Sequence, residues 1–169
     1  MTDFQQAREL YNLAFGEDKP FDDLLFADFF EYCHTLFEGD RLVSMLFLLP
    51  CELCFEDKIL PVQYIYAAAT QPDQRGKGHM GRLLDQIKRQ ESIFLLRPAT
   101  DKLVDYYKRQ GFTPFNAEAR LSGVPFVRVE DRLCRLAEGG DNSGERFIMM
   151  CSGIDSSQLE NLGCAFTML

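Results

Sequence analysis

Glycines and cations alternate in Arg75-Gly-Lys-Gly-His-Met-Gly81, which follows an apolar stretch ending in the small residues Ala67 to Ala69. Glycines at the start of a helix expose successive backbone N–H groups, and the helix dipole adds partial positive charge there. Arg75 and Lys77 contribute full positive charges. The segment therefore predicts a cradle for phosphate groups. A plain strand–turn–helix connection, with glycines serving only the turn geometry, is the alternative.

The residues around the glycines limit which class of phosphate ligand the segment could bind. Gly76-x-Gly78-x-x-Gly81 formally matches the dinucleotide fingerprint, and Asp101 lies about twenty residues further on. In that fold the glycines follow the strand at once and further βαβ units come after them. Here the segment 71–75 intervenes and too little chain remains, so a dinucleotide site is only an alternative. The P-loop pattern GxxxxGK[ST] is absent from the sequence.

A tyrosine is the second candidate for chemistry. Tyr107 stands in Tyr107-x-x-x-Gly111-Phe112, within a segment of helical spacing. Taken by itself, this spacing favours a ring packed into the core. The neighbouring Tyr106 points about 100° away around the helix.

The glycine segment resembles the acyl-CoA loop of the GNAT superfamily of N-acetyltransferases, [Q/R]-x-x-G-x-[G/A]. Arg75-Gly-Lys-Gly78-His-Met80 fits this pattern, with Met80 in the place of Gly or Ala and Gly81 one residue later. The loop follows a strand and a short bend that contains proline, as in the family.

The tyrosine segment is similar to the later Y-x-x-x-G-F signature of the same family, and Arg97-Pro98 precedes it as in the family. Thr100 and Leu103 replace the usual Asn and Ala of that helix. The two motifs occur in the family's order, and the resemblance covers roughly residues 1–115. The tail is also faintly similar to the sterol-carrier-like C-terminal part of two-domain GNAT enzymes, but it is much shorter.

The resemblance implies a cytoplasmic enzyme that transfers an acetyl group from acetyl-CoA directly to a primary amine of a small molecule or peptide, without a metal. The residues that it assigns to acetyl-CoA are Ala68, Ala69, Thr70, Arg75, Gly76, Lys77, Gly78, His79, Met80, Gly81 and Thr100. It places an N–H group of the 68–70 strand against the thioester oxygen. It makes Tyr107 the proton donor to the departing thiolate, since a phenol near pKa 10 lies close to a thiol near 8.5. For the His79 side chain, a surface position or a phosphate contact is expected.

The general base is not identified from the sequence, because the central strand 64–70 carries no carboxylate. Glu31 or Glu52 acting through water, and the terminal carboxylate of Leu169, are the candidates. A non-catalytic acyl-CoA-binding or regulatory module therefore remains an alternative, supported also by the departures at Met80, Thr100 and Leu103. The excess of acidic residues up to Asp57 favours a cationic amine or, more simply, a solvated acidic helix face.

The elements that position these residues follow from hydrophobic spacing. Helices are predicted over 4–15, 24–30, 78–91 and 101–109, and strands over 35–37, 42–49, 64–70, 93–96, 147–151 and 163–169. The fold class is α/β (α+β): a GNAT-like mixed, mostly antiparallel central sheet flanked by helices. Residues 1–115 are expected to form the acetyltransferase core, and 116–169 a short C-terminal extension packed on it.

Composition excludes several classes. With 46% hydrophobic residues and a net charge of −8 over 169 residues, the chain is neither disordered nor suited to nucleic acid or anionic membranes. The apolar run Leu42 to Leu49 is too short to span a membrane, and no secretory signal is visible. Because no signal peptide is visible, the six cysteines are expected to be reduced structural thiols. The lone Cys51-x-x-Cys54 would need further ligands to form a zinc site, and the chain has only two histidines. A homodimer is left open.

Overall fold

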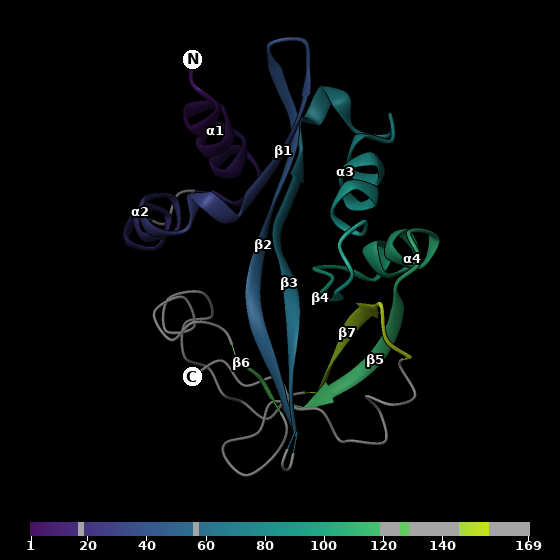
Figure 1. The fold of residues 1–169 in the computed structure, drawn as a ribbon. Coiled ribbons are helices and arrows are strands. Elements are labelled where there is room, and N and C mark those ends of the chain that lie inside the picture. Colours follow the sequence, from purple (N-terminus) through teal and green to yellow (C-terminus); the bar gives the residue numbers. More distant parts are fainter. Residues whose placement is uncertain (17–18, 56–57, 119–125, 129–145, 156–169) are drawn as a thin grey trace. The chain divides into compact units, whose positions relative to one another are not determined.

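The computed structural model describes residues 1–16, 19–55, 58–118, 126–128 and 146–155 (Figure 1). The chain divides into two compact units, Met1–Leu49 with Ile65–Gln90 and Pro50–Tyr64 with Glu91–Leu169. In chain order, the helices and strands are α1 (Asp3–Phe15), α2 (Lys19–Asp28), the 3₁₀-helix η1 (Phe30–Tyr32), β1 (Cys33–Glu38), β2 (Arg41–Phe55), β3 (Lys58–Thr70), the 3₁₀-helix η2 (Pro72–Gln74), α3 (His79–Ile87), β4 (Ile93–Leu96), α4 (Asp101–Arg109), β5 (Thr113–Glu118), β6 (Phe126–Arg128) and β7 (Arg146–Ser152).

In the described part of the chain, the strands form one hydrogen-bonded sheet. Its seven strands follow the order β1-β2-β3-β4-β7-β5, with β6 paired to β2. The β3–β4 pair is parallel, whereas β1–β2, β2–β6, β4–β7 and β5–β7 are antiparallel. The predicted mixed, mostly antiparallel sheet with flanking helices is thereby confirmed.

An aromatic cluster holds the helices of the first unit against its strands. The ring of Phe26, which is 1% exposed, packs edge-on against Phe4, Tyr11 and Phe47, with centroids 5.7, 5.5 and 5.5 Å away. These residues come from α2, α1 and β2. Edge-to-face packing of this kind adds about 0.5–1.5 kcal/mol per pair to the burial of the rings. The cluster therefore fixes α1 and α2 on the β2 strand, while Figure 1 shows α3 on the other side of these strands.

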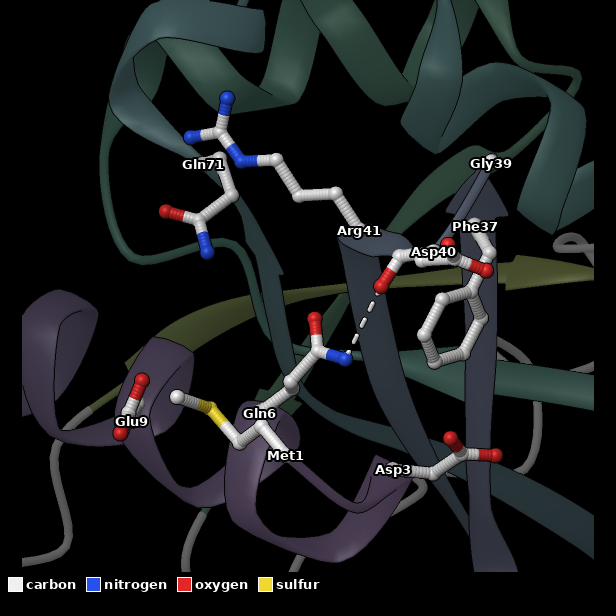
Figure 2. A pocket seen from close by; sticks show the side chains of 9 residues that line it. All are labelled: Met1, Asp3, Gln6, Glu9, Phe37, Gly39, Asp40, Arg41 and Gln71. Carbon is white, nitrogen blue, oxygen red and sulfur yellow. Dashed lines mark hydrogen bonds between the residues drawn. The ribbon is translucent and has the colours of Figure 1, made fainter.

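One amide ties α1 to the β1–β2 hairpin. The Gln6 side chain donates to the carbonyl of Asp40 at 3.1 Å (Figure 2). It also accepts from the Leu42 N–H at 2.9 Å. Gln6 also lines a pocket of about 770 Å³ together with Met1, Asp3, Glu9, Phe37, Gly39, Asp40, Arg41 and Gln71. No residue assigned to acetyl-CoA from the sequence is among this lining.

Strand β7 organises the second unit. It pairs with β4 along Met150–Ser152 and with β5 along Arg146–Cys151, so it lies between two strands that precede it in the chain. Phe94, Leu95, Phe115, Met149 and Met150 are all at most 2% exposed and form the core of this unit. Residue 116, where the sequence suggests a boundary, lies inside β5.

The predicted and observed elements differ mainly in their ends. β4 and α4 occupy the predicted ranges. α2 begins earlier and ends at Asp28, β2 runs past Pro50 to Phe55, β3 begins at Lys58, and α3 ends at Ile87. The predicted strand over 163–169 lies outside the described residues.

Candidate functional site

The central strand contains an irregular residue just before its end. Ala67 in β3 has φ +51°, a left-handed conformation that costs a residue with a Cβ about 1–2 kcal/mol. Such a residue disturbs the alternation of the strand and re-aims the backbone groups after it. The residues after it are Ala68, half-buried, Ala69, buried, and Thr70, the three from which a thioester contact is expected. The sequence contains small residues here, but it did not predict the positive φ of Ala67.

The end of β3 is fastened to β2. The hydroxyl groups of Thr70 and Ser44 are hydrogen-bonded at 2.8 Å, and the Gln71 N–H donates to the Val43 carbonyl at 2.9 Å. Because Ser44 is fully buried, the Thr70 hydroxyl is used within the fold. The backbone of Thr70, and not its side chain, is thus the part suited to contact a ligand.

An ion pair fixes the bend that follows β3. Arg41 donates two hydrogen bonds of 2.8 Å to the carboxylate of Asp73 in η2. The pKa of Asp73 is lowered to about 2, chiefly by the hydrogen bond from Arg41 and next by the hydrogen bond from Gln74. Both side chains of this pair are about half exposed, so the pair orients the bend more than it stabilises the fold.

The two cations of the loop are held by its own polar groups. Arg75 donates from Nε to the Thr70 carbonyl at 3.2 Å, and Lys77 donates to the Gln74 side-chain oxygen at 3.0 Å. Both residues are exposed. Their charges are therefore kept next to the glycines without being buried, as a phosphate-binding loop requires.

Two glycines give the loop its shape. Gly76 and Gly78 have φ +78° and +82°, a region that disfavours side chains. A Cβ added to either glycine would meet no atom within 4 Å. These positions therefore need glycine because of their backbone conformation, and not because a side chain would clash with neighbouring atoms. The space where a side chain would stand is open.

Helix α3 begins immediately after this turn. Gly78 is its N-cap residue and makes no side-chain cap, and the first backbone bond of the helix runs from the Arg82 N–H to the Gly78 carbonyl at 3.0 Å. The N–H groups of His79, Met80 and Gly81 precede that bond and have no acceptor within the helix. The first turn carries no acidic residue that would compete for them. This is the arrangement of an anion site at a helix N-terminus.

The His79 side chain does not join the loop surface. It is 8% exposed, and its Nδ1 lies 3.7 Å from a carboxylate oxygen of Glu38 on β1. Glu38 is itself bound by Arg82, whose hydrogen bond and charge lower the pKa of that carboxyl. The expected surface position of this side chain is therefore wrong. The backbone N–H of His79 remains a candidate ligand group.

The tyrosine signature forms the end of α4. The Phe112 N–H donates to the Tyr107 carbonyl and the Gly111 N–H to the Lys108 carbonyl, both at 3.0 Å, with Gly111 at φ +82°. These two bonds form a Schellman motif. The motif's usual apolar contact is also present, because the Tyr107 and Phe112 rings pack edge-on at 5.7 Å. Helix termination thus accounts for Gly111, Phe112 and the ring of Tyr107, but not for the hydroxyl group.

The surroundings of Tyr107 alter its acidity. The residue is 7% exposed, and burial, followed by the charge of Tyr106, raises its pKa to about 12. Thr100, the residue before α4, is exposed and its hydroxyl makes no helix cap. Both residues belong to the second unit, whereas residues 68–70 and 75–81 belong to the first.

The remaining candidates are placed as follows. Glu31 in η1 is exposed; the side chain of Glu52 and all of Leu169 lie outside the described residues.

Among the described residues, no group of three or more His, Cys, Asp or Glu side chains could hold a metal ion. Cys33 and Cys151 are free thiols, and burial raises the pKa of Cys33 to about 12, as expected for an unreactive thiol. None of the described helices has the length and apolarity needed to cross a membrane.

Comparison with solved structures supports the fold. The chain is similar to a GCN5-related N-acetyltransferase from Anabaena variabilis, with 20% identity and a TM-score of 0.56 over 69% of this chain and 32% of that one. It is similar over 88% of its length, and 90% of the other chain, to a Corynebacterium glutamicum protein described as histone acetyltransferase HPA2 and related acetyltransferase, with 16% identity and a TM-score of 0.57. The Bacillus subtilis N-acetyltransferase YlbP, solved in complex with coenzyme A, matches 89% of this chain and 90% of its own, with 10% identity and a TM-score of 0.52.

Two features limit what these structural matches show about the chain. The chain spans about a third of the length of the Anabaena protein, and identities this low carry the fold alone. No curated protein matches the chain. A family model, by contrast, matches the sequence itself over residues 1–115, and its description is acetyltransferase (GNAT) domain. Since this match covers more than half of the sequence, the chain belongs to the GNAT acetyltransferase family.

Proposed function

We propose that this protein transfers an acetyl group from acetyl-CoA to a primary amine of a small molecule or peptide. The observation that carries the proposal is the turn at Gly76 and Gly78 leading into α3. Both glycines have positive φ, and the space where a side chain would stand is open. A loop of this shape allows a pyrophosphate to approach the backbone closely.

The phosphate end of coenzyme A would be held mainly by backbone donors. The N–H groups of His79, Met80 and Gly81 lie at the positive end of the α3 dipole. Arg75 and Lys77 add charge on the open side of the loop. Met80 stands where the family has Gly or Ala, but a backbone N–H does not depend on the side chain. The B. subtilis relative, solved with coenzyme A, supports the same ligand for this fold.

The thioester end would meet the last residues of β3. The re-aimed backbone after Ala67 supplies N–H groups for the carbonyl oxygen, on which negative charge develops. We assign to Tyr107 the stabilisation of the departing thiolate. Its pKa of about 12 is roughly 3.5 units above that of a thiol, so complete proton transfer would cost about 5 kcal/mol. A hydrogen bond from the neutral hydroxyl to the thiolate avoids that cost.

The raised pKa also favours the second candidate function, a non-catalytic acyl-CoA-binding module. A buried phenol that does not release its proton is equally suited to packing. The two functions make the same prediction for binding and opposite predictions for turnover.

Titration calorimetry with coenzyme A, together with an unbiased panel of primary amines incubated with acetyl-CoA, tests the proposal. We expect micromolar binding of coenzyme A, no binding of NAD, and an acetylated amine detectable by mass spectrometry. Binding without any acetylated product would favour the non-catalytic module. Stabilisation by NAD and not by coenzyme A would support a dinucleotide site instead.

A further inference from the structure

Two residues lie opposite each other where the β1–β2 hairpin meets its turn (Figure 1). Glu38 is the last residue of β1 and Arg41 the first of β2, and they form the final pair of the ladder. Gly39 and Asp40 make the turn between them. The ladder pair, and not the turn, therefore sets the spacing of these two side chains.

Each of the two side chains holds one flank of the loop 75–81. Arg41 donates two hydrogen bonds of 2.8 Å to Asp73 in η2, which directly precedes the loop. The Glu38 carboxylate accepts a hydrogen bond from Arg82 in α3, which directly follows the loop. The same end of one hairpin is thus attached to both sides of the loop that is assigned to the phosphates.

The ring of His79 adds a second contact on the α3 side. Its Nδ1 lies 3.7 Å from a Glu38 carboxylate oxygen, and the residue is 8% exposed. Within the described part of the chain, neither ring nitrogen has a hydrogen-bond partner. Residues three apart in a helix share a face, so His79 and Arg82 both approach Glu38 from the first turn of α3. Glu38 therefore contacts the turn whose backbone N–H groups point towards the phosphates.

These polar contacts act where α3 has no apolar anchor. The buried apolar residues of the helix are Leu83, Leu84 and Ile87, and all three come after its first turn. Ahead of the helix, a Cβ added to Gly76 or Gly78 would meet no atom within 4 Å. Because the apolar packing of α3 begins only after its first turn, the contacts to the hairpin decide where the loop and the first turn lie.

We propose that Glu38 and Arg41 are positioning residues for acetyl-CoA, which hold the loop 75–81 where its backbone N–H groups meet the phosphates. This inference rests on the proposed acetyl transfer. Neither side chain acts as a ligand group, because Arg41 is bound to Asp73 and the Glu38 carboxylate would repel a phosphate. The two residues act through Asp73 and Arg82, from opposite sides of the loop.

The opposite charges of the two residues make the proposal testable by the sign of an effect. Removing the Glu38 carboxylate takes a negative charge away from an anion site, so Coulomb interactions alone would make coenzyme A bind more tightly. Removing Arg41 takes away a positive charge and would weaken binding on the same ground. Positioning predicts weaker binding in both cases. A loss common to the two substitutions therefore cannot come from their charge.

Titration calorimetry with coenzyme A compares Glu38→Ala and Arg41→Ala with the wild type. We expect each substitution to raise the Kd about 2- to 30-fold, the range for residues that influence a site without touching its ligand. Glu38→Gln keeps an acceptor for Arg82 and should lose less affinity than Glu38→Ala. Asp23→Ala removes another exposed carboxylate that is paired with an arginine, Arg8, and should leave the Kd unchanged.

A second measurement separates positioning from a general loss of structure. Acetyl-pantetheine carries the thioester of acetyl-CoA but none of its phosphates. In the acetyl-transfer assay, Glu38→Ala should raise the KM for acetyl-CoA and leave kcat unchanged, and its kcat/KM for acetyl-pantetheine should equal that of the wild type. A purely structural role would lower Tm and reduce kcat/KM equally for the two thioesters.

A Glu38→Ala protein that binds coenzyme A as tightly as the wild type, or more tightly, would overturn the positioning role. Equal losses of kcat/KM on the two thioesters would overturn it as well. If Glu38→Ala does not fold, the sign of the change in Kd for Glu38→Gln decides the question. In each of these cases, coenzyme A binding and turnover by the wild type leave the proposed function standing. A wild-type protein that does not bind coenzyme A overturns the proposed function and this inference together.

Discussion

Substitutions at Gly78 separate the cost of a strained backbone from the cost of a blocked ligand. The residue has φ +82°, and a Cβ placed on it would have no atom within 4 Å, so alanine introduces strain without a clash. A left-handed residue with a Cβ costs about 1–2 kcal/mol, which for a protein of this size lowers Tm by roughly 2–8 °C. Asparagine tolerates this conformation better and should lose about half as much stability.

Ligand binding should respond differently to the same two substitutions. Either side chain fills the open space above the loop and prevents a pyrophosphate oxygen from reaching the backbone N–H groups. Losing one charge-assisted hydrogen bond costs about 1.5–3 kcal/mol, which corresponds to a Kd for coenzyme A that is about 10- to 150-fold higher. Gly78→Asn should therefore combine the smaller change in Tm with the full change in Kd.

Gly39 offers the matched control for this experiment. It has φ +60° and also nothing within 4 Å of an added Cβ, but it lies in the β1–β2 turn. Gly39→Ala and Gly39→Asn should change Tm by similar amounts and leave the calorimetric Kd for coenzyme A unaltered. A folded Gly78→Asn protein with wild-type affinity would refute the assignment of the loop.

Three further substitutions or deletions have definite expected outcomes. Tyr107→Phe should lower kcat about 10- to 1000-fold with little change in coenzyme A affinity, whereas Tyr106→Phe should be nearly silent; equal steady-state rates for both would disprove the role of Tyr107. Asp73→Asn should lower Tm slightly at neutral pH. This difference should disappear as the pH falls from about 4 to about 2, because the carboxyl's stabilising effect is present above its unfolded pKa near 3.9 and lost as it is protonated near its folded pKa of about 2. We propose that residues 116–169 belong to the folded core, so a chain ending at Glu118 should not unfold cooperatively on heating; an unchanged Tm would contradict this.

The ends of some helices could be predicted to the exact residue, because a nearby glycine terminates them. Helix α1 ends before Gly16, whose φ is +83°, and α4 ends in a Schellman motif at Gly111. In both cases one glycine supplies a conformation that other residues avoid, so the sequence itself marks the end. The same reasoning located the loop at Gly76 and Gly78.

The ends of the strands could not be predicted from the sequence, because they depend on pairing with strands far away in the chain. Pro50 was expected to end its strand because it lacks an N–H group. In the structure, β1 pairs with β2 only as far as Phe47 and β6 begins its pairing at Glu52, so Pro50 falls between these two ladders. The missing donor therefore interrupts neither of them. Which strand lies beside a proline cannot be read from the residues around it.

The geometry of the candidate site could be predicted only where its residues are neighbours in the chain. The loop 75–81 is continuous, and its glycines and cations identify it. Contacts between separate elements give no such signal, because no spacing in the sequence connects their residues. The side chain of His79 shows this limit, because it is buried and lies beside Glu38, which belongs to a strand far from it in the chain.

The place of β7 between β4 and β5 has a consequence for how the protein is made. A ribosome completes β4 and β5 before it reaches β7, so each strand emerges with the edge that β7 will cover still unpaired. Unpaired strand edges are sites at which chains associate wrongly. A nascent chain halted before Arg146, or a chain cut before that residue, would carry two such edges. Synthesis of the second unit thus leaves an interval in which chaperone protection matters most, and that interval closes only when Ser152 has left the ribosome.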